Sequence, residues 1–425
     1  MSRELGRARS WFRCLAFGLP FAVAAPLSCA ASGVEGEPEE GPVPDAGVLP
    51  DAAPPDDGAV GLDAPSDVAA GARCSSGGFC YEPLPVPVPL VAVSATSMDQ
   101  AWAVGGDAIV RWDGTSWKSV YRHDGLTSGT TVALRAVFAA TDDVWAVGST
   151  PFPDRRLHLV RYARGDGGAP VFREVSTEEP SVGDFWSGWL TPSADALWFL
   201  EADSRHVLRF RDAAGGGVTI DRWLPQGEPE DDDAYYAWYG LWGFASDDVY
   251  VSGMTCSFGS CTGLLAHYDG ASWSLTVLED PMIVTGMFGT RAPGQPKHLW
   301  LEVADASTGA RSIRLVPVSS DGGLGVPVLE RAVSGCGAFM GSAAAPGAAW
   351  LSDGCLVHRW NGSTLEVTPI AVGGEPPGRV NALWAGGADE AWVVGSSLPY
   401  KGPKFLELGF AARREGKWLV DGGKP

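Results

Sequence analysis

The stretch AWAVGGDAIVRWDGTSW, residues 101–117, decides the fold, because its pattern recurs along the chain. It holds two apolar runs, Ala101–Val104 and Ile109–Trp112, with a glycine pair between them and Asp113-Gly114 after them. Asp-Gly between strand-like runs is a strong hairpin signal, since a primed turn requires positive φ at both central residues. Together with the apolar run Leu90–Val93, the stretch predicts four short strands.

Seven aromatic anchors mark the recurrence of this unit, at intervals of 42 to 53 residues: Trp102, Trp145, Trp198, Tyr250, Trp300, Trp350 and Trp392. Repeats of this length that are rich in short strands are typical of β-propellers, with one blade per repeat. The sequence therefore predicts an all-β, seven-bladed β-propeller over residues 90–425, with the anchors packed between blades. The outer hairpin recurs at Asp269-Gly270 and Asn361-Gly362, and in looser form at Glu415–Trp418.

The amino terminus has the pattern of an export signal, predicted over residues 1–28. Four arginines precede an apolar stretch from Cys14 to Leu27, which matches a basic region followed by an apolar region. The stretch is too short for a membrane span and is interrupted by Gly18, Pro20 and Pro26.

The end of this signal predicts where the protein goes. Pro26-Leu27-Ser28-Cys29-Ala30 resembles a bacterial lipobox, with Cys29 as the lipidated residue. The resemblance implies an outer-membrane or cell-surface lipoprotein that contacts the membrane only through this anchor. Ala22–Ala24 offers a competing site for ordinary signal cleavage, which would leave the protein secreted or periplasmic.

Residues 29–73 form a predicted acidic tether, and residues 74–89 a lead-in rich in cysteine and proline. Residues 30–73 hold ten acidic residues, one basic residue and no aromatic ring, so the tether cannot bury enough apolar surface to fold. The whole chain carries a net charge of −20 at pH 7. That charge argues against nucleic acid as a partner, because phosphate binding depends on Lys and Arg.

Six cysteines follow the tether in three local couples: Cys74 and Cys80, Cys256 and Cys261, Cys336 and Cys355. An even number in an exported chain predicts disulfides, and proximity favours pairing within each couple, although other pairings stay open. Zinc is not indicated, because no couple has the two-residue spacing of a zinc site.

Known catalytic motifs are missing from the sequence. It contains no phosphate loop, nucleophile elbow or zinc-protease motif, and its six histidines are too scattered in sequence to suggest a metal site or a charge relay. We therefore expect no metal, no cofactor and no catalytic residues, and a binding protein is favoured over an enzyme.

One group of aromatic residues is a candidate ligand site, because rings on loops can stack on sugars or anchor peptides. Trp238 also fits an inner strand, where core packing would explain it. The candidates are Trp186, Trp189, Tyr235, Tyr236, Trp238 and Tyr239.

Three motifs carry a resemblance to a known family: the opening Cys74–Pro85, the core Asp142–Gly148 and the hairpin Arg111–Trp117. The chain resembles exported bacterial β-propeller proteins of the myxobacterial type, many of them lipoproteins of gliding, predatory soil bacteria. It is similar, more distantly, to the Asp-box propellers, although the full Asp-box pattern is not met and no sialidase arginine triad can be placed. The resemblance implies a propeller in the cell envelope and brings no activity with it.

Two functional hypotheses follow. The first is a monomeric, non-catalytic scaffold propeller of the cell envelope that binds a protein partner. The alternative is a carbohydrate-binding propeller, or a glycoside-active enzyme, that uses the aromatic cluster from Tyr235 to Trp242.

Overall fold

The computed structural model describes residues 74–416 apart from several connecting segments. The segments outside the description are residues 124–130, 141–142, 152–155, 165–169, 176–184, 202–205, 213–216, 228–234, 258–259, 279–281, 291–293, 334–336, 338, 355, 372–377 and 398–407. The predicted signal and tether, with Cys29, lie outside it, as do Cys336 and Cys355.

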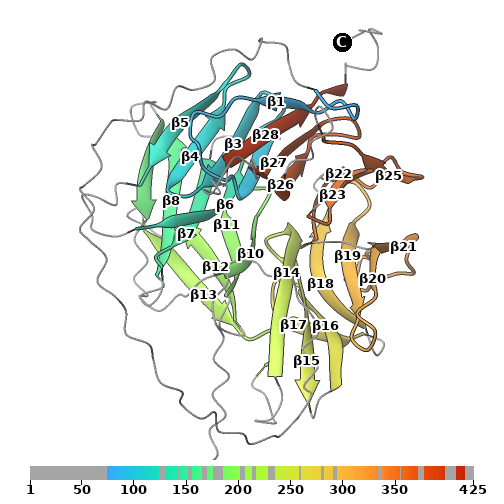
Figure 1. Cartoon of the computed structure of the whole chain (residues 1–425). Coiled ribbons are helices and arrows are strands. Elements are labelled where there is room, and N and C mark those ends of the chain that lie inside the picture. The colour runs from blue at the N-terminus through green and yellow to red at the C-terminus, as the bar shows by residue number, and fades with distance from the viewer. Residues whose placement is uncertain are drawn as a thin grey trace, which may run out of the picture. The chain divides into compact units, whose positions relative to one another are not determined.

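The described chain forms seven antiparallel sheets of four strands, which we call blades 1 to 7 (Figure 1). Blades 1 to 3 consist of β2 (Ala92–Ser97), β3 (Gln100–Gly105), β4 (Ala108–Trp112) and β5 (Trp117–Arg122); β6 (Ala133–Ala139), β7 (Asp143–Ser149), β8 (Leu157–Arg164) and β9 (Pro170–Val175); and β10 (Phe185–Leu190), β11 (Ala196–Glu201), β12 (Val207–Asp212) and β13 (Val218–Trp223). Blades 4 and 5 consist of β14 (Tyr235–Ala245), β15 (Asp248–Ser257), β16 (Ser260–Tyr268) and β17 (Trp273–Val277); and β18 (Met282–Gly289), β19 (His298–Asp305), β20 (Arg311–Pro317) and β21 (Leu329–Val333). Blades 6 and 7 consist of β22 (Met340–Ala345), β23 (Ala348–Ser352), β24 (Val357–Trp360) and β25 (Leu365–Thr368); and β26 (Arg379–Ala385), β27 (Ala391–Ser397), β28 (Leu408–Arg414) and β1 (Cys80–Glu82).

The first strands of the seven blades meet one another around a ring. Each of β2, β6, β10, β14, β18, β22 and β26 contacts the first strand of the next blade, and β26 returns to β2. The prediction of a seven-bladed propeller is confirmed. Because blades 1 to 6 are antiparallel meanders, the turns between their first and second strands and between their third and fourth strands lie on one face of the ring. We call this the turn face.

All seven anchors lie in the second strand of their blade and are buried. Trp102 packs on Tyr162 of blade 2 at 4.9 Å between ring centroids, and Trp300 packs on Trp360 of blade 6 at 5.8 Å. Trp392 of blade 7 lies 5.3 Å from Trp112 of blade 1. In each of these pairs the anchor contacts the following blade, which confirms the expected wedges.

Glycine in the first strands makes room for these packed rings. A Cβ atom built on Gly341 of blade 6 would lie 1.9 Å from Cε1 of Phe288 in blade 5, and one on Gly243 of blade 4 would lie 2.5 Å from the ring of Trp189 in blade 3. Close approach of neighbouring blades therefore requires a residue without a side chain at both positions.

The predicted hairpins at the Asp-Gly and Asn-Gly sites form, but with a different turn. Gly114 has a φ of +94°, but the φ of Asp113 is not positive, as a primed turn would require. Instead, Oδ1 of Asp113 accepts hydrogen bonds from the backbone N–H groups of Thr115 and Ser116. The turn is thus a wider loop closed by the aspartate side chain, and not a primed two-residue turn.

The ring is closed by the predicted lead-in. β1 pairs with β28 in antiparallel register, with Cys80 opposite Arg413 and Glu82 opposite Ala411, and becomes the outer strand of blade 7. The looser hairpin expected from Glu415 onward does not supply this strand, because β1 occupies that edge of β28. Residues 417–425 lie outside the described part of the chain.

A charged contact joins blades 4 and 5. Oδ1 of Asp248 lies 2.8 Å from Nε2 of His267, and Oδ2 of Asp248 accepts a hydrogen bond from Nζ of Lys297. Burial acts to raise the pKa of Asp248, but the hydrogen bonds from His267 and Lys297 outweigh it, so the pKa lies below the usual value of 3.8. Folding therefore favours the ionised carboxylate.

This pKa predicts a pH-dependent cost for Asp248→Asn. A carboxyl group whose pKa is lower in the folded state stabilises the fold above its unfolded pKa and loses that effect as the pH falls through its folded pKa. We expect the substitution to lower the free energy of unfolding by about 1–2 kcal/mol at pH 7 and by much less near pH 2. Urea denaturation at both pH values measures this, with the exposed neighbour Asp247→Asn as the control. An equal cost at both pH values would contradict the prediction.

Candidate functional site

Two of the six candidate aromatic residues belong to the core. Trp189 and Trp238 are 5% and 4% exposed, and both lie in the large cluster of buried side chains that joins blades 3 to 6. Nε1 of Trp238 donates to the side chain of Gln226 at 3.3 Å. These two rings have no face free for a ligand, because inter-blade packing covers them.

The three tyrosines differ in exposure. Tyr235 at the start of β14 is 61% exposed. Tyr236 is half-buried against the core, and burial with the nearby Tyr235 raises the pKa of Tyr239 to about 12. The side chain of Trp186 lies outside the described part of the structure. The described rings thus present one exposed side chain and no flat aromatic platform.

Two of the three predicted cysteine couples form disulfides, Cys74–Cys80 and Cys256–Cys261. The first lies beside β1, and the second joins the ends of β15 and β16. Disulfides are typical of proteins exported from the cytoplasm, so the folded chain belongs outside it. The pairing of Cys336 with Cys355 stays a prediction.

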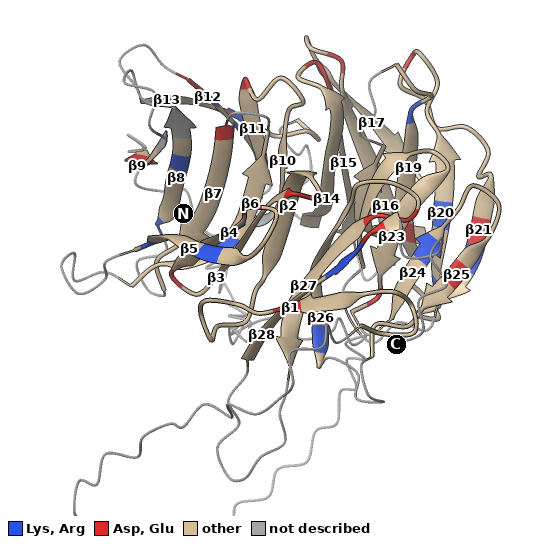
Figure 2. Ribbon diagram, turned by 90° about the horizontal axis from the view of Figure 1, so that it is seen from above, with Lys and Arg blue, Asp and Glu red and all other residues tan. Residues whose placement is uncertain are grey.

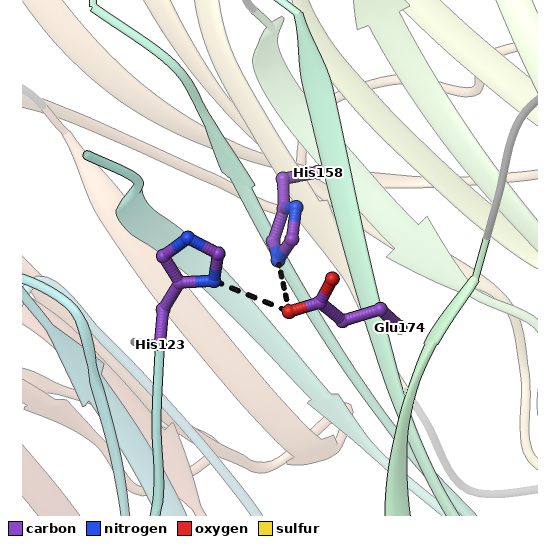
Figure 3. Close-up of side chains that lie close together, drawn as sticks. All are labelled: His123, His158 and Glu174. Atoms are coloured by element: carbon purple, nitrogen blue, oxygen red, sulfur yellow. Dashed lines mark hydrogen bonds and ion pairs between the residues drawn. The ribbon is translucent and has the colours of Figure 1, made fainter. Parts of the chain in front are cut away.

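A cluster of ionisable side chains connects blades 1 and 2 (Figure 3). His123 directly follows β5, His158 is the second residue of β8, and Glu174 lies near the end of β9. Their ligand atoms all lie within 4.8 Å of one another. Oε1 of Glu174 is 3.2 Å from Nδ1 of His123 and 3.6 Å from Nε2 of His158. All three lie on the face opposite the turn face, and we call them the His-His-Glu cluster.

Burial and neighbours set the charge state of this cluster. Burial lowers the pKa of His158, so its imidazole is neutral at pH 7. Partial burial acts to raise the pKa of Glu174, but the Tyr121 hydroxyl and the two imidazoles outweigh it, and the pKa is lowered. An ionised carboxylate beside a neutral imidazole is a donor set suited to a metal cation.

Sequence reasoning missed the His-His-Glu cluster. Its members are separated by 35 and 16 residues, which matches no local motif, and the six histidines were expected to be scattered. The signal that could have found it is positional. His123 and Glu174 lie at the ends of the fourth strands of adjacent blades, which the ring brings side by side.

A groove opens on the turn face between blades 5 and 6. It has a volume of about 370 Å³, and its lining includes Leu315 and Val328 of blade 5 with Pro346 and Trp360 of blade 6. Trp360 is held in place because its Nε1 donates to the carbonyl of Pro346 at 2.9 Å. We call this the 5–6 groove.

The edge of the 5–6 groove is apolar and exposed. Val328 is 61% exposed, and Val326, two residues earlier, is 83% exposed. Both belong to the connection between β20 and β21. An exposed valine pair beside a groove is more informative than single exposed residues elsewhere, because clustered apolar surface marks interaction sites.

Lysine and arginine residues are distributed over several blades (Figure 2). Many of those described are paired with acids, as in Arg209–Asp221, Arg314–Glu330 and Arg413–Glu82, at 2.7 to 2.9 Å. These cations are therefore partly neutralised by the fold itself. Among the described residues, no helix is long and apolar enough to cross a bilayer.

Comparison with known proteins places the fold. No family model and no curated protein matches the chain. It is similar to the structure of YCF48 from Cyanidioschyzon merolae, at 13% identity and a TM-score of 0.51, over 80% of this chain and 99% of that one. A structure described as YCF48 bound to D1 peptide aligns at 14% identity and a TM-score of 0.49, over 82% and 99% of the two chains. A functionally unknown protein from Desulfotomaculum acetoxidans aligns at 10% identity and a TM-score of 0.47, over 69% and 90%. At these identities the likeness concerns the fold alone.

Proposed function

We propose that the protein is a non-catalytic binding propeller of the cell envelope, which holds a protein partner in the 5–6 groove. The observation that carries this proposal is the groove itself, with the exposed Val328 at its edge. Trp360 and Leu315, which are 6% and 2% exposed, form its packed floor. The volume is large enough for one or two side chains of a partner, and it lies between two rigid sheets.

The chemistry of the groove selects an extended segment with an apolar anchor. The exposed side chains of Val326 and Val328 offer area for an aliphatic or aromatic residue of the partner, and such anchors account for most of the affinity of an interface. The net charge of −20 favours a partner of opposite sign, because complementary charge accelerates encounter. The partner is therefore a basic protein with an exposed apolar residue.

The envelope location belongs to the same proposal. Its support is the pair of disulfides, the export signal predicted over residues 1–28 and the lipobox-like sequence at Cys29. In this proposal the lipid on Cys29 anchors the chain and the acidic tether holds the propeller away from the bilayer. Cleavage after Ala24 would give a secreted binding protein with the same groove.

The test uses a photo-crosslinking residue at position 326 in the full-length chain, in cells. We expect one dominant crosslinked protein, whose binding is then measured with purified components. Val328→Lys should weaken that binding at least tenfold, because it replaces an apolar contact with a charge of the same sign as the basic partner, at a cost of about 1.4 kcal/mol or more. Val171→Lys is the control, since Val171 is also exposed, at 47%, but belongs to β9 of blade 2.

Two outcomes would overturn the proposal. The first is equal binding by the Val328→Lys and Val171→Lys proteins, which would place the partner elsewhere. The second is strong, specific glycan binding on an array that is lost with Tyr235→Ala in a folded protein. That result would favour the carbohydrate-binding alternative, since Tyr235 is the exposed member of the aromatic cluster.

A further inference from the structure

We propose that His123, His158 and Glu174 bind one zinc ion that links blades 1 and 2. The three side chains come from the end of β5, the start of β8 and the end of β9, and they converge on one point (Figure 3). This site lies on the face opposite the 5–6 groove, so it is independent of the proposed partner binding.

The spacing of the donor atoms fits a metal centre. Donors bound tetrahedrally at about 2.0–2.2 Å lie roughly 3.3–3.6 Å from one another. Oε1 of Glu174 is 3.2 Å from Nδ1 of His123 and 3.6 Å from Nε2 of His158. All the ligand atoms of the set lie within 4.8 Å of one another, so binding would draw the two imidazole nitrogens toward tetrahedral spacing.

One ligand atom is buried without a hydrogen bond. Nε2 of His158 is shielded from solvent and has no hydrogen-bond partner, since the carboxylate of Glu174 is 3.6 Å away. A buried polar atom without a partner costs free energy, and a metal ion at the cluster would remove that cost. This atom distinguishes the cluster from an ordinary hydrogen-bonded histidine pair.

The surroundings support metal binding as well. The hydroxyl of Tyr121 donates to Oε1 of Glu174 at 2.9 Å and fixes the orientation of the carboxylate. Groups that hold a ligand in this way tune affinity in known metal sites. The two imidazole rings meet edge to face, with centroids 4.8 Å apart, so both nitrogens approach the carboxylate from neighbouring directions.

The donor set selects the class of metal. Two imidazoles and one carboxylate suit zinc and its transition-metal neighbours, whereas calcium and magnesium prefer oxygen ligands alone. The side chain of Glu174 is 55% exposed, which leaves the ion open to water at a fourth position. The ion would join the outer strands of two blades, and its expected role is to stabilise the contact between them.

The experiment uses the full-length chain, freed of metal with a chelator and titrated with zinc chloride by calorimetry. We expect one zinc ion per chain and a rise in Tm on binding. Cobalt chloride should give the visible absorption bands of a tetrahedral nitrogen and oxygen site. Tyr121→Phe should weaken zinc binding by roughly 10–100-fold, and His158→Gln or Glu174→Gln by more than that.

His206→Gln is the matched control. His206 lies 3.8 Å from Glu201 in blade 3, but Arg222 also lies near that carboxylate, so this pair should not bind a cation. Its zinc affinity and Tm rise should equal those of the unsubstituted chain. Zinc binding that persists undiminished in folded His158→Gln protein, or a folded chain that binds no zinc at all, would overturn the proposal. The first result would place the ion elsewhere, with Cys336 and Cys355 the next residues to substitute.

Discussion

A chain that lacks Cys74–Glu82 is expected to lose at least about 5 kcal/mol of its free energy of unfolding. The deletion removes β1, the outer strand of blade 7, together with Phe79, which is fully buried and packs edge to face on Trp350 at 5.5 Å. Loss of a buried phenylalanine alone costs about 3–5 kcal/mol, and loss of the strand pairing between β1 and β28 adds to that cost.

Hydrogen bonds explain why this segment acts across blades. The hydroxyl of Tyr81 donates to the carbonyl of Ile370 at 2.9 Å, and Oγ of Ser75 donates to the carbonyl of Pro369 at 2.8 Å. Both acceptors directly follow blade 6, so the segment fixes blade 6 to blade 7.

Urea denaturation followed by tryptophan fluorescence measures the effect of the deletion. The control is deletion of residues 30–73, the predicted tether, which should leave the unfolding midpoint unchanged. If the two deletions gave the same midpoint, closure by β1 would not contribute to stability. A milder variant, Phe79→Ala, should give an intermediate loss and keep the disulfide.

The second large effect is expected from Trp198→Ala, at about 3–5 kcal/mol. Trp198 is fully buried, stacks on Trp223 at 5.3 Å, and contacts Tyr268 of blade 4 at 5.6 Å. The guanidinium of Arg209 lies 5.2 Å from its ring. Truncation would leave a cavity between two blades that rigid sheets cannot close, and this is why the cost exceeds the loss of apolar area alone.

Tyr235→Ala provides the comparison for Trp198→Ala, because it also removes an aromatic ring but one that is 61% exposed. Its cost should stay within about 0.5 kcal/mol. Both variants are measured by thermal and urea unfolding. A cost below about 1 kcal/mol for Trp198→Ala would contradict the wedge role of this ring.

The blades could be predicted because their signals are local. An anchor such as Trp145 follows a polar turn and is followed by a glycine within a few residues. The turn at Asp113-Gly114 is recognised from two adjacent residues. The closure of the ring by β1 could not be predicted from local patterns. The pairing of Cys80 with Arg413 joins residues 333 positions apart, and no local pattern states which strand will fill the edge of β28.

The functional sites could not be predicted from the sequence for related reasons. In β14 the register shifts between Trp238 and Gly240, so strict alternation cannot tell which rings face the core. The His-His-Glu cluster depends on the contact between blades 1 and 2, which exists only after the ring has formed. The sequence shows the repeats plainly, but a site shared by two repeats requires their relative position.

The pairing of β1 with β28 also sets the order of events when the chain is made. β1 is among the first folded residues to emerge, and its partner strand ends only at Arg414. The two strands are very far apart in the sequence. Such contacts form slowly, because the chain loses the entropy of the open loop before the contact contributes any stabilising free energy. Blade 7 therefore stays incomplete until the chain has been synthesised at least as far as Arg414. Until Arg414 is present, β1 lacks its complete partner strand, and the ring of blades cannot be closed.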